Sequence, residues 1–374
     1  MRVVAVIPAR GGVSGAALAL VHMLLGLVSR FKVVEVVAVT SPEALKYPAV
    51  RRLRENGARL VFSRLTGPLY WAGLMIALFY QLRHGRFDVC HFSTPKTLVL
   101  MYPAARLVAH RLVLSLEGYP PYELGHSRGF RRVFGMFAWY AALRFADRIA
   151  ACSEWLRRIC LKAVEDGERF TTVHNPVDFE RFKNTSAEAV GSERFVKLVV
   201  VSRLDYVKGV DVALKALDIL RRKGLHHVGL VVVGDGPEAG KLRRLAAELG
   251  VDGLVEFTGF RADVERLIAA ADIVLVPSRY EPFGMVAAEA AAASKPVVAS
   301  RVGGLREIVV DGETGLLFEP GDHEDLADKI AVLIAEAEKA AAMGVRGRRR
   351  VEELFTPQKA AEKLIRVYLE ALRR

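Results

Sequence analysis

The sequence predicts an α/β protein made of two doubly wound, Rossmann-like domains that face each other across a cleft. Short, valine-rich runs alternate with longer apolar helical patterns. A small polar segment interrupts the alternation near the middle of the 374 residues, and the alternation then restarts. Runs such as 33–40, which are apolar at nearly every position, are typical of parallel strands covered on both faces. Strands that alternate with helices wind into one parallel sheet per domain.

The first predicted domain covers residues 1–183. Its expected strands are 2–8, 33–40, 58–62, 89–92, 112–115 and 148–151, and its expected helices are 16–29, 68–83, 97–109 and 128–145. The opening apolar run is too short for a signal peptide. The uncharged run Leu65–Leu82 is shorter than a membrane span.

Residues 184–194 are small, polar and mixed in charge, which is typical of a linker between domains. They lead into a second predicted domain, 195–356. Its expected strands are 196–202, 228–233, 255–258, 273–277 and 297–300, and its expected helices are 210–223, 238–249, 264–270, 285–294 and 324–342. A last amphipathic helix, 357–374, closes the chain.

Composition limits the possible partners and the compartment. Residues 1–190 hold 26 Lys and Arg against 14 Asp and Glu, whereas the rest of the chain is balanced. The first half should therefore meet something anionic: a phosphate-bearing acceptor, a membrane surface or nucleic acid. The three cysteines, Cys90, Cys152 and Cys160, suit buried thiols in a reducing compartment better than disulfides or a zinc site. Scarce Asn and Gln indicate a thermophile or a GC-rich genome.

The strongest candidate site is the segment 281–289, which reads EPFGMVAAE and follows the predicted strand 273–277. A helix is expected to begin at about Pro282, since proline is favoured as the first helical residue. The first amides of a helix lack partners within it and bind anions and hydroxyl groups. The amides expected to do so here are those of Phe283, Gly284 and Met285.

Two glutamates bracket this segment. Glu281 should lie at the mouth of the helix end. Glu289 should lie two turns along, where a carboxylate can accept hydrogen bonds from a vicinal diol. A helix that starts at the carboxyl end of a parallel strand is also where such folds bind ligands. The alternative is an N-terminal Glu favoured by the helix dipole and a solvated helix Glu.

A second candidate segment, 202–209, reads SRLDYVKG between a strand and a helix. Arg203 can bind a phosphate through two hydrogen bonds, and Lys208 adds a compact positive charge. Gly209 lets the backbone approach closely. The alternative is an arginine and a lysine that are merely solvated.

Two glycine turns follow other strands. Gly234, in GDGP, serves either the geometry of a tight turn or contact with a ligand. The segment 11–15, GGVSG, resembles half of a dinucleotide fingerprint. However, the second strand does not end in the acidic residue that NAD binding needs. Gly12 is therefore expected in a cradle for phosphate or sugar.

Together these segments resemble glycosyltransferase family 4, whose members are retaining transferases of the GT-B fold. The resemblance covers nearly the whole chain and is clearest over 196–322. EPFGMVAAE matches the family's Glu-x7-Glu signature, and SRLDYVKG matches its Arg…Lys-Gly diphosphate clamp. Further segments in family order are DVCHF (88–92), ADRIAACSEWL (146–156), HNPVDFERF (174–182), GDGP (234–237), FTGF (257–260), VGGLREIVVDGETGLL (302–317) and the turn 320–322.

The resemblance implies a role for each candidate residue. Glu289 would bind the ribose hydroxyls of the nucleotide, and Glu281 would meet the transferred sugar. Arg203 and Lys208 would neutralise the diphosphate leaving group. The other donor-binding residues that it implies are Phe283, Gly284 and Met285 through their amides, Phe260 and Arg261 beside the base, Gly234, and Gly12 beside the phosphates and the acceptor.

One position departs from the family pattern. Many members carry a His-Gly or His-Asp pair after the strand that matches 112–116, with the His near the reacting carbon, and this chain has Glu117-Gly118. Glu117 is thus a candidate catalytic carboxylate, as a base or as the stabiliser of a cation-like transition state. It would equally mark a different subgroup or a lost activity. His91 and His126 are the candidates to replace the missing His, although a lone histidine is more often structural.

The resemblance also implies the cofactor requirement. The chain has no Asp-x-Asp sequence, the motif with which GT-A transferases hold their metal ion. Cationic side chains at 203 and 208 would take the place of that metal in neutralising charge. We therefore expect no metal ion and no other cofactor.

The function expected is transfer of a sugar from a nucleotide-sugar donor to a hydroxyl acceptor, with retention of configuration. The second domain would hold the donor and the first the acceptor, with hinge closure between them. The helix 357–374 would cross back to the first domain, as is typical of the family. The alternatives are a sugar phosphorylase, a nucleotide-sugar epimerase, or a sugar-nucleotide-binding protein without turnover. A nucleic-acid partner is not expected, because it would explain the basic charge but not the glutamate pair or the Arg…Lys-Gly motif.

The excess of basic residues also suggests where the protein acts and what its acceptor is. The expected location is the cytoplasm, or the cytoplasmic face of a membrane. Residues 56–87 contain no acid. Basic residues beside exposed aromatic ones suit peripheral docking on an anionic leaflet, with a lipid-linked or otherwise anionic acceptor. The alternative, preferred for helix 68–83, is that the apolar helices pack inward. The residues concerned are Arg59, Arg64, Arg83, Arg86, Tyr70, Trp71, Phe79 and Tyr80, then Arg128, Arg131, Arg132, Trp139 and Tyr140.

Overall fold

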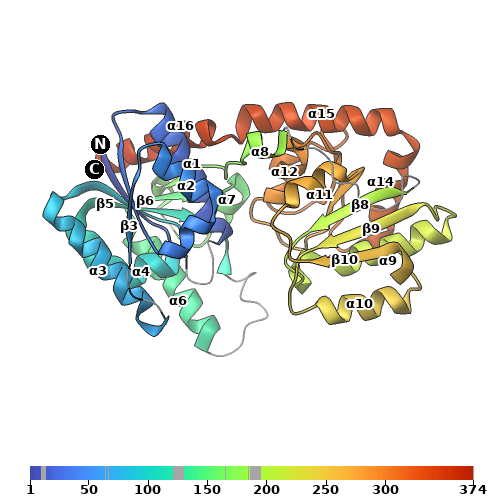
Figure 1. Cartoon of the computed structure of the whole chain (residues 1–374), viewed down its shortest axis with the longest axis horizontal. Coiled ribbons are helices and arrows are strands. Elements are labelled where there is room, and N and C mark those ends of the chain that lie inside the picture. The colour runs from blue at the N-terminus through green and yellow to red at the C-terminus, as the bar shows by residue number, and fades with distance from the viewer. Residues whose placement is uncertain are drawn as a thin grey trace. The chain divides into compact units, whose positions relative to one another are not determined.

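A computed structural model describes residues 1–9, 14–63, 65, 67–120, 130–164, 166–183, 185 and 195–373. The chain forms two compact units, residues 1–176 with 357–374 and residues 177–356 (Figure 1). The boundary between the two units lies after Pro176, before the segment 184–194 that was expected to link the domains. Val177 belongs to the second unit, because its amide donates to the carbonyl of Phe355.

The first unit contains a parallel sheet of seven strands in the order β3-β2-β1-β4-β5-β6-β7. The strands are β1 (Arg2–Val6), β2 (Glu35–Thr40), β3 (Arg59–Phe62), β4 (Phe87–Phe92), β5 (Ala109–Leu116), β6 (Arg148–Ala151) and β7 (Phe170–Thr172). The chain winds outward from β1 in one direction and from β4 in the other. The strand order therefore reverses between β1 and β4, which is the position where such sheets bind ligands.

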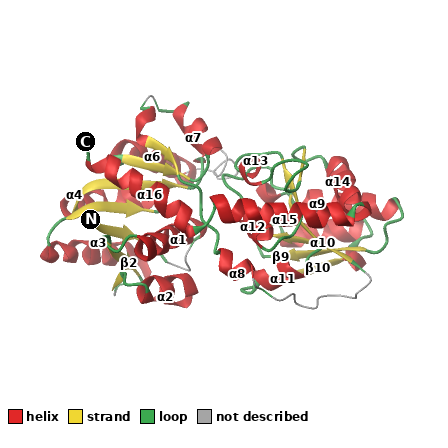
Figure 2. Ribbon diagram, turned by 90° about the horizontal axis from the view of Figure 1, so that it is seen from above, coloured by secondary structure: helices red, strands yellow, loops and turns green. Residues whose placement is uncertain are grey.

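Helices cover both faces of this sheet (Figure 2). On one face, α1 (Gly15–Arg30) packs against α2 (Pro48–Glu55) and α16 (Pro357–Leu372). On the other face, α4 (Pro95–Val108) packs against α3 (Tyr70–Phe79) and α6 (Phe130–Phe145). The helix α7 (Glu154–Leu161) follows β6. Two helices that begin at the reversal point have hydroxyl caps: Ser14 Oγ accepts from the Ala17 amide, and Thr94 Oγ1 accepts from the Thr97 amide.

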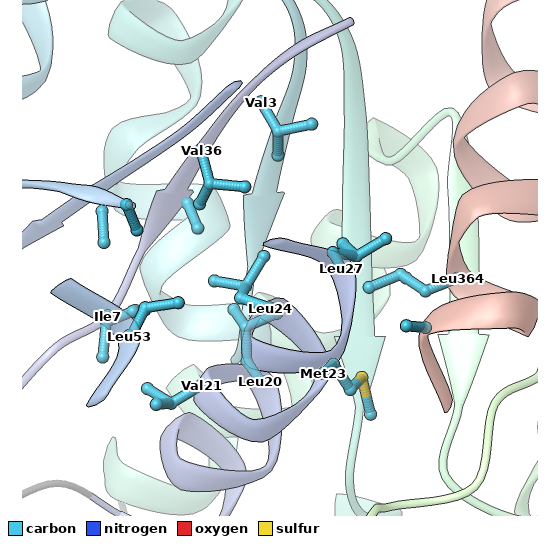
Figure 3. Close-up of a cluster of buried hydrophobic side chains, with 14 of the residues drawn as sticks. Val3, Ile7, Leu20, Val21, Met23, Leu24, Leu27, Val36, Leu53 and Leu364 are labelled. Atoms are coloured by element: carbon cyan, nitrogen blue, oxygen red, sulfur yellow. The ribbon is translucent and has the colours of Figure 1, made fainter. Parts of the chain in front are cut away.

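The core between α1, α16 and the sheet is aliphatic. Leu20, Leu24 and Leu27 of α1 are fully buried, and Leu364 of α16 lies beside Leu27 (Figure 3). Gly26 allows this close approach, because a Cβ there would lie 2.1 Å from the carbonyl oxygen of Pro357. The C-terminal helix is thus an integral part of the first unit.

The second unit contains a parallel sheet of six strands in the order β10-β9-β8-β11-β12-β13. The strands are β8 (Val196–Val201), β9 (Val228–Val233), β10 (Val255–Gly259), β11 (Ile273–Val276), β12 (Val297–Ser300) and β13 (Leu316–Phe318). The helices are α8 (Phe179–Lys183), α9 (Val210–Arg222), α10 (Ala239–Glu248), α11 (Val264–Ala270), α12 (Met285–Ala292), α13 (Leu305–Ile308), α14 (His323–Ala335) and α15 (Ala337–Leu354). In the part of the chain that the structure describes, no helix is long and apolar enough to cross a membrane.

The single helix expected over 324–342 is wrong. The chain forms α14 and α15 instead, separated by Glu336, whose φ of −112° and ψ of 57° are not helical. The two helices meet different surfaces, since α14 packs on α9 whereas α15 packs on α12. The break allows the chain to change direction between those surfaces.

Several arginines of the first unit bind the carbonyl ends of helices, which carry a partial negative charge. Arg86 donates to the carbonyl of Arg106 in the last turn of α4. Arg106 donates to the carbonyl of Phe145 at the end of α6, and Arg169 donates to two more carbonyls there. Part of the basic excess therefore stabilises the fold itself.

Candidate active site

The order of strands in the second sheet reverses between β8 and β11, so the loops after these strands lead away in opposite directions. These loops are 202–209 and 277–284, the two strongest sequence motifs. They pack tightly, because Gly209 has a φ of +65° and a Cβ there would lie 2.0 Å from the carbonyl oxygen of Pro277. The fold thus brings both motifs to one point at the carboxyl edge of the sheet.

Lys208 and Glu281 form an ion pair at this point. Lys208 Nζ donates to Glu281 Oε2 at 2.8 Å, and the two side chains are only 27% and 15% exposed. The hydroxyl of Ser278 also donates to Glu281 Oε2, at 3.3 Å. Burial opposes the charge on Lys208, but Glu281 and Asp205 outweigh it, so the pKa of Lys208 is raised above its ordinary value. Lys208 is therefore charged at neutral pH.

Arg279 fastens the two loops together. Its backbone amide donates to the carbonyl of Val207 at 2.7 Å, and its guanidinium donates to the carbonyl of Tyr206 at 2.8 Å. The same guanidinium binds both carboxylate oxygens of Asp211 at 2.7 Å. Arg279 thereby holds the short turn that carries Lys208.

Arg203 lies in the same loop but does not join the ion pair. Its Nε donates to Asp205 Oδ2 at 2.7 Å, and its side chain is 75% exposed. The structure therefore places one half-buried cation, Lys208, and one exposed cation, Arg203, after β8.

The helix α12 begins at Met285, which agrees with the expected helix 285–294 but not with a start at about Pro282. Gly284 precedes the helix with a φ of +113°, a conformation that side-chain-bearing residues rarely adopt. A Cβ at Gly284 would also lie 2.5 Å from Leu305 Cδ2. The first helical amides are consequently those from Met285 onward, and the Phe283 side chain is buried in front of them.

Glu289 lies in the second turn of α12, where it is half-buried. Its carboxylate forms no hydrogen bond or ion pair with any residue that the structure describes. Burial raises its pKa to about 7; Glu265 and Asp178 act in the same direction, and Arg181 opposes them. A half-buried carboxyl group with a raised pKa and no protein partner is typical of a functional site rather than of a structural contact.

The remaining second-unit candidates follow β9 and β10. Gly234 has a φ of +130°, and a Cβ there would lie 1.8 Å from the carbonyl oxygen of Ser202, so this glycine serves close packing of two loops. Phe260 is 82% exposed. Arg261 donates twice to Asp263, at 2.8 and 2.7 Å, and these hydrogen bonds lower the pKa of Asp263 to about 2. Arg261 is therefore held in place, whereas Phe260 is open to solvent.

In the first unit, Glu117 directly follows β5. Its Oε2 accepts a hydrogen bond from Asn175 Nδ2, which lies after β7. Asn175 is 5% exposed, so the carboxylate of Glu117 is positioned by a buried partner. Gly12 lies outside the described residues, and the structure therefore places nothing at that position.

His91 is a structural histidine. It is fully buried, with Nδ1 at 2.6 Å from the hydroxyl of Tyr368 and Nε2 at 2.9 Å from Ser115 Oγ. Burial lowers its pKa to about 3, and it does not replace the family histidine. His126 lies outside the described residues. Across the described residues, no three His, Cys, Asp or Glu side chains gather as metal ligands would.

Comparison with known families and proteins identifies the chain. The model of Glycosyltransferase Family 4 matches residues 13–181, and that of Glycosyl transferases group 1 matches residues 182–350. The chain is also 33% identical to the GDP-mannose-dependent alpha-(1-6)-phosphatidylinositol monomannoside mannosyltransferase of Mycolicibacterium smegmatis. That likeness extends over 279 residues, 69% of this chain and 70% of the relative. The chain belongs to glycosyltransferase family 4.

Two further proteins are similar to this family 4 chain. The N-acetyl-alpha-D-glucosaminyl L-malate synthase of Bacillus anthracis is 28% identical over 290 residues, 76% of this chain and 74% of that protein. HepE of Anabaena, solved in complex with UDP and glucose, has the same fold, with a TM-score of 0.80, 24% identity and 98% of each chain covered. The family and the two-domain Rossmann-like GT-B fold are thus confirmed, and the protein is a nucleotide-sugar glycosyltransferase.

Sequence analysis missed two residues of this family 4 chain that position candidate groups. Asn175 lies in the segment HNPVDFERF, so its motif was visible, but its contact with Glu117 depends on the separation of β5 and β7 in the sheet. Arg279 belongs to no motif, and its role emerges only where two loops meet.

Proposed function

We propose that the chain transfers a sugar from a nucleoside diphosphate sugar to a hydroxyl acceptor with retention of the anomeric configuration. The observation that carries this proposal is the Lys208–Glu281 pair at the reversal of strand order. A cation suits the diphosphate, and a carboxylate suits the hydroxyl groups of the sugar. The two groups lie 2.8 Å apart, so both are close enough to contact neighbouring parts of one donor molecule.

The donor would lie along the carboxyl edge of the second sheet. Glu289 would accept hydrogen bonds from the ribose hydroxyls, which its half-buried and unpartnered carboxylate supports. Arg203 and Lys208 would bind the diphosphate. The remaining proposed donor contacts are the amides of Phe283, Gly284 and Met285, Phe260 and Arg261 beside the base, and the loop backbones at Gly234 and Gly12.

The proposed reaction breaks the bond between the anomeric carbon and the diphosphate oxygen, and the electron pair leaves with that oxygen. The acceptor oxygen forms its bond on the same face, which retains the configuration. The acceptor proton passes to the carboxylate of Glu117 or to the departing diphosphate. Lys208 and Arg203 stabilise the negative charge that grows on the leaving group.

Side-chain cations would supply this charge stabilisation without a metal ion. Lys208 is charged at neutral pH and is held at a fixed position by Glu281 and by the loop that Arg279 fastens. Preorganised charge of this kind needs no reorganisation when the bond breaks.

The acceptor would be lipid-linked or otherwise anionic, at the cytoplasmic face of a membrane. The excess of basic residues in the first 190 positions supports an anionic acceptor. The relative from M. smegmatis, which is named for a phosphatidylinositol monomannoside, supports a lipid-linked one.

A thermal-shift screen against UDP, GDP, ADP and their sugars tests the donor, because a ligand raises the melting temperature of the protein that it binds. One nucleotide series should raise it. NMR of the product should then show the anomeric configuration of the donor. Release of free sugar that depends on phosphate, epimerisation without an acceptor, binding without turnover, or an inverted product would each contradict the proposal.

A further inference from the structure

Three neighbouring helices of the first unit, α3, α4 and α6, form one layer, with α4 packed between the other two (Figure 1). None of the three contains an aspartate or a glutamate. A helix layer that faces water normally carries charges of both signs. The composition of this layer is therefore unusual for a surface in contact with water.

The helix α3 is apolar on both sides. Its inner side buries Leu74 and Leu78 completely. On its outer side, Ile76 is 61% exposed, and Tyr80, directly after the helix, is 53% exposed. A surface helix that lacks a polar outer face has no favourable contact with water along that face.

The outer sides of α4 and α6 continue this apolar surface. Val133, Phe137 and Tyr140 follow one another at helical spacing on α6 and are 68%, 61% and 46% exposed. Leu107, at the end of α4, is 55% exposed. Single exposed apolar residues are common, but a group of them on adjoining helices marks an interaction surface.

A groove of about 590 Å³ opens beside α3. Its lining includes Val61, Phe62, Leu65, Gly73, Ile76 and Tyr80, so that it joins the outer surface at Ile76 and Tyr80 and reaches inward to the edge strand β3. Gly73 lets Ser63 and Leu65 of this lining pack closely on α3, because a Cβ there would lie 2.2 Å from Ser63 Oγ. The lining is predominantly apolar, which suits a hydrocarbon chain better than a polar ligand.

Four exposed cations lie on these helices or shortly after them: Arg83, Lys96, Arg132 and Arg144. None of them forms an ion pair with a described residue, in contrast to Arg106, which is bound to Asp147. Arg83 lies 3.5 Å over the ring of Tyr80. Unpaired cations beside exposed aromatic and aliphatic side chains are complementary to the anionic headgroups and acyl chains of a bilayer.

We propose that the outer face of α3, α4 and α6 lies on an anionic lipid bilayer, and that a hydrocarbon chain of a lipid occupies the groove beside α3. A bilayer fits this face better than a second copy of the chain, because two cationic faces would repel each other. The docking itself needs no catalysis. Only the idea that the bound lipid is the sugar acceptor rests on the proposed function.

Co-sedimentation of the full chain with vesicles tests the docking. We expect binding to vesicles of phosphatidylcholine with 30% phosphatidylglycerol, at least tenfold weaker binding to phosphatidylcholine alone, and release in 0.5 M salt. Ile76→Asp and Phe137→Asp should each weaken binding at least tenfold. Val345→Asp, at a 48% exposed position of α15 in the second unit, should bind as the wild type does.

Two further measurements distinguish a damaged donor site from a loss of membrane docking, and membrane docking from lipid binding in the groove. The thermal shift with the cognate nucleotide should be the same in Ile76→Asp and in the wild type, which shows that the donor site is intact whether or not vesicles bind. Val61→Trp, which fills the groove from β3, should lower the amount of lipid retained in native mass spectrometry without releasing the protein from vesicles. Absence of binding to anionic vesicles, or wild-type binding by both aspartate variants, overturns the proposal. So does a dimer in light scattering that Ile76→Asp converts to a monomer without any vesicle binding.

Discussion

Lys208 Nζ lies 2.8 Å from Oε2 of Glu281, although 73 residues separate them in the sequence. The contact exists because strand order reverses between β8 and β11, so that the loops after both strands open at one point. The two strongest sequence motifs of the chain thus meet in a single ion pair.

Replacement of Arg279 by Ala should lower turnover about 10- to 100-fold, because small displacements of a catalytic group are costly. Arg279 binds the carbonyl of Tyr206 and both oxygens of Asp211, and so holds the turn of Lys208. The affinity for the nucleotide should change much less. Steady-state kinetics beside calorimetric titration with the nucleotide measure the two effects.

Asp211→Asn supplies the matched control for the ion pair between Arg279 and Asp211. If the pair acts as a unit, turnover in the double variant should resemble that of Arg279→Ala rather than the product of two separate losses. Additive losses would show that Arg279 acts without Asp211.

Glu289→Gln should stabilise the protein at pH 8 and have little effect at pH 5. The folded-state pKa is about 7, against an ordinary value of 4.5, so folded Glu289 holds its proton where the unfolded chain has released it. The free energy of unfolding therefore falls as pH rises from 4.5 to 7. The neutral amide removes that cost, on the order of 1–3 kcal/mol. Denaturant melts at both pH values measure it.

Glu256→Gln, at an exposed position on β10, is the control and should shift neither melt. Glu289→Gln should also reduce the thermal shift produced by the nucleotide, since an amide oxygen accepts hydroxyl hydrogen bonds more weakly than a carboxylate does. Equal stability of wild type and variant at pH 8 would mean that the carboxylate is solvated after all.

Gly284→Ala should destabilise the protein by about 1–3 kcal/mol. The alanine would have to adopt a φ of +113°, and its Cβ would lie 2.5 Å from Leu305 Cδ2. Gly240→Ala is the matched control, because it lies within α10 with no atom within 4 Å of the added Cβ. That change should stabilise the protein by up to about 1 kcal/mol. Urea unfolding of the three proteins separates these outcomes.

Glu117→Gln should lower turnover strongly and leave the affinity for the donor nearly unchanged, since the side chain belongs to the first unit, whereas all the proposed donor contacts except Gly12 belong to the second. Its hydrogen-bond partner Asn175 is also in the first unit. Kinetics with the cognate donor, beside the thermal shift it produces, measure both quantities. Unchanged turnover would make Glu117 a loop carboxylate with no part in the reaction.

The sequence predicted most of the strands of both sheets, because valine-rich runs alternate clearly with helical patterns along the chain. The helix 264–270 and the strands 148–151 and 297–300 have the expected bounds. The strands β7 and β13 were missed, since three residues are too few to show alternation. The break between α14 and α15 was missed as well, because it depends on which surfaces those helices meet.

For the site, the sequence identified Lys208, Glu281 and Glu289 from motif spacing, but it did not predict their geometry. The positive φ of Gly284, which leaves Phe283 outside α12, is not revealed by any helix propensity. Arg279 was missed for a different reason, since its partners lie on another loop and on α9. Such long-range contacts exist only once the strand order is known.

The central claim is that Lys208, held by Glu281, stabilises the departing diphosphate. The most direct test is the turnover number of Lys208→Met with the cognate donor, measured beside the dissociation constant of the nucleotide. We predict a fall in turnover of at least about 100-fold, because the positive charge matters most in the transition state, with less than a tenfold change in affinity. A folded Lys208→Met protein that turns over at the wild-type rate would contradict the claim.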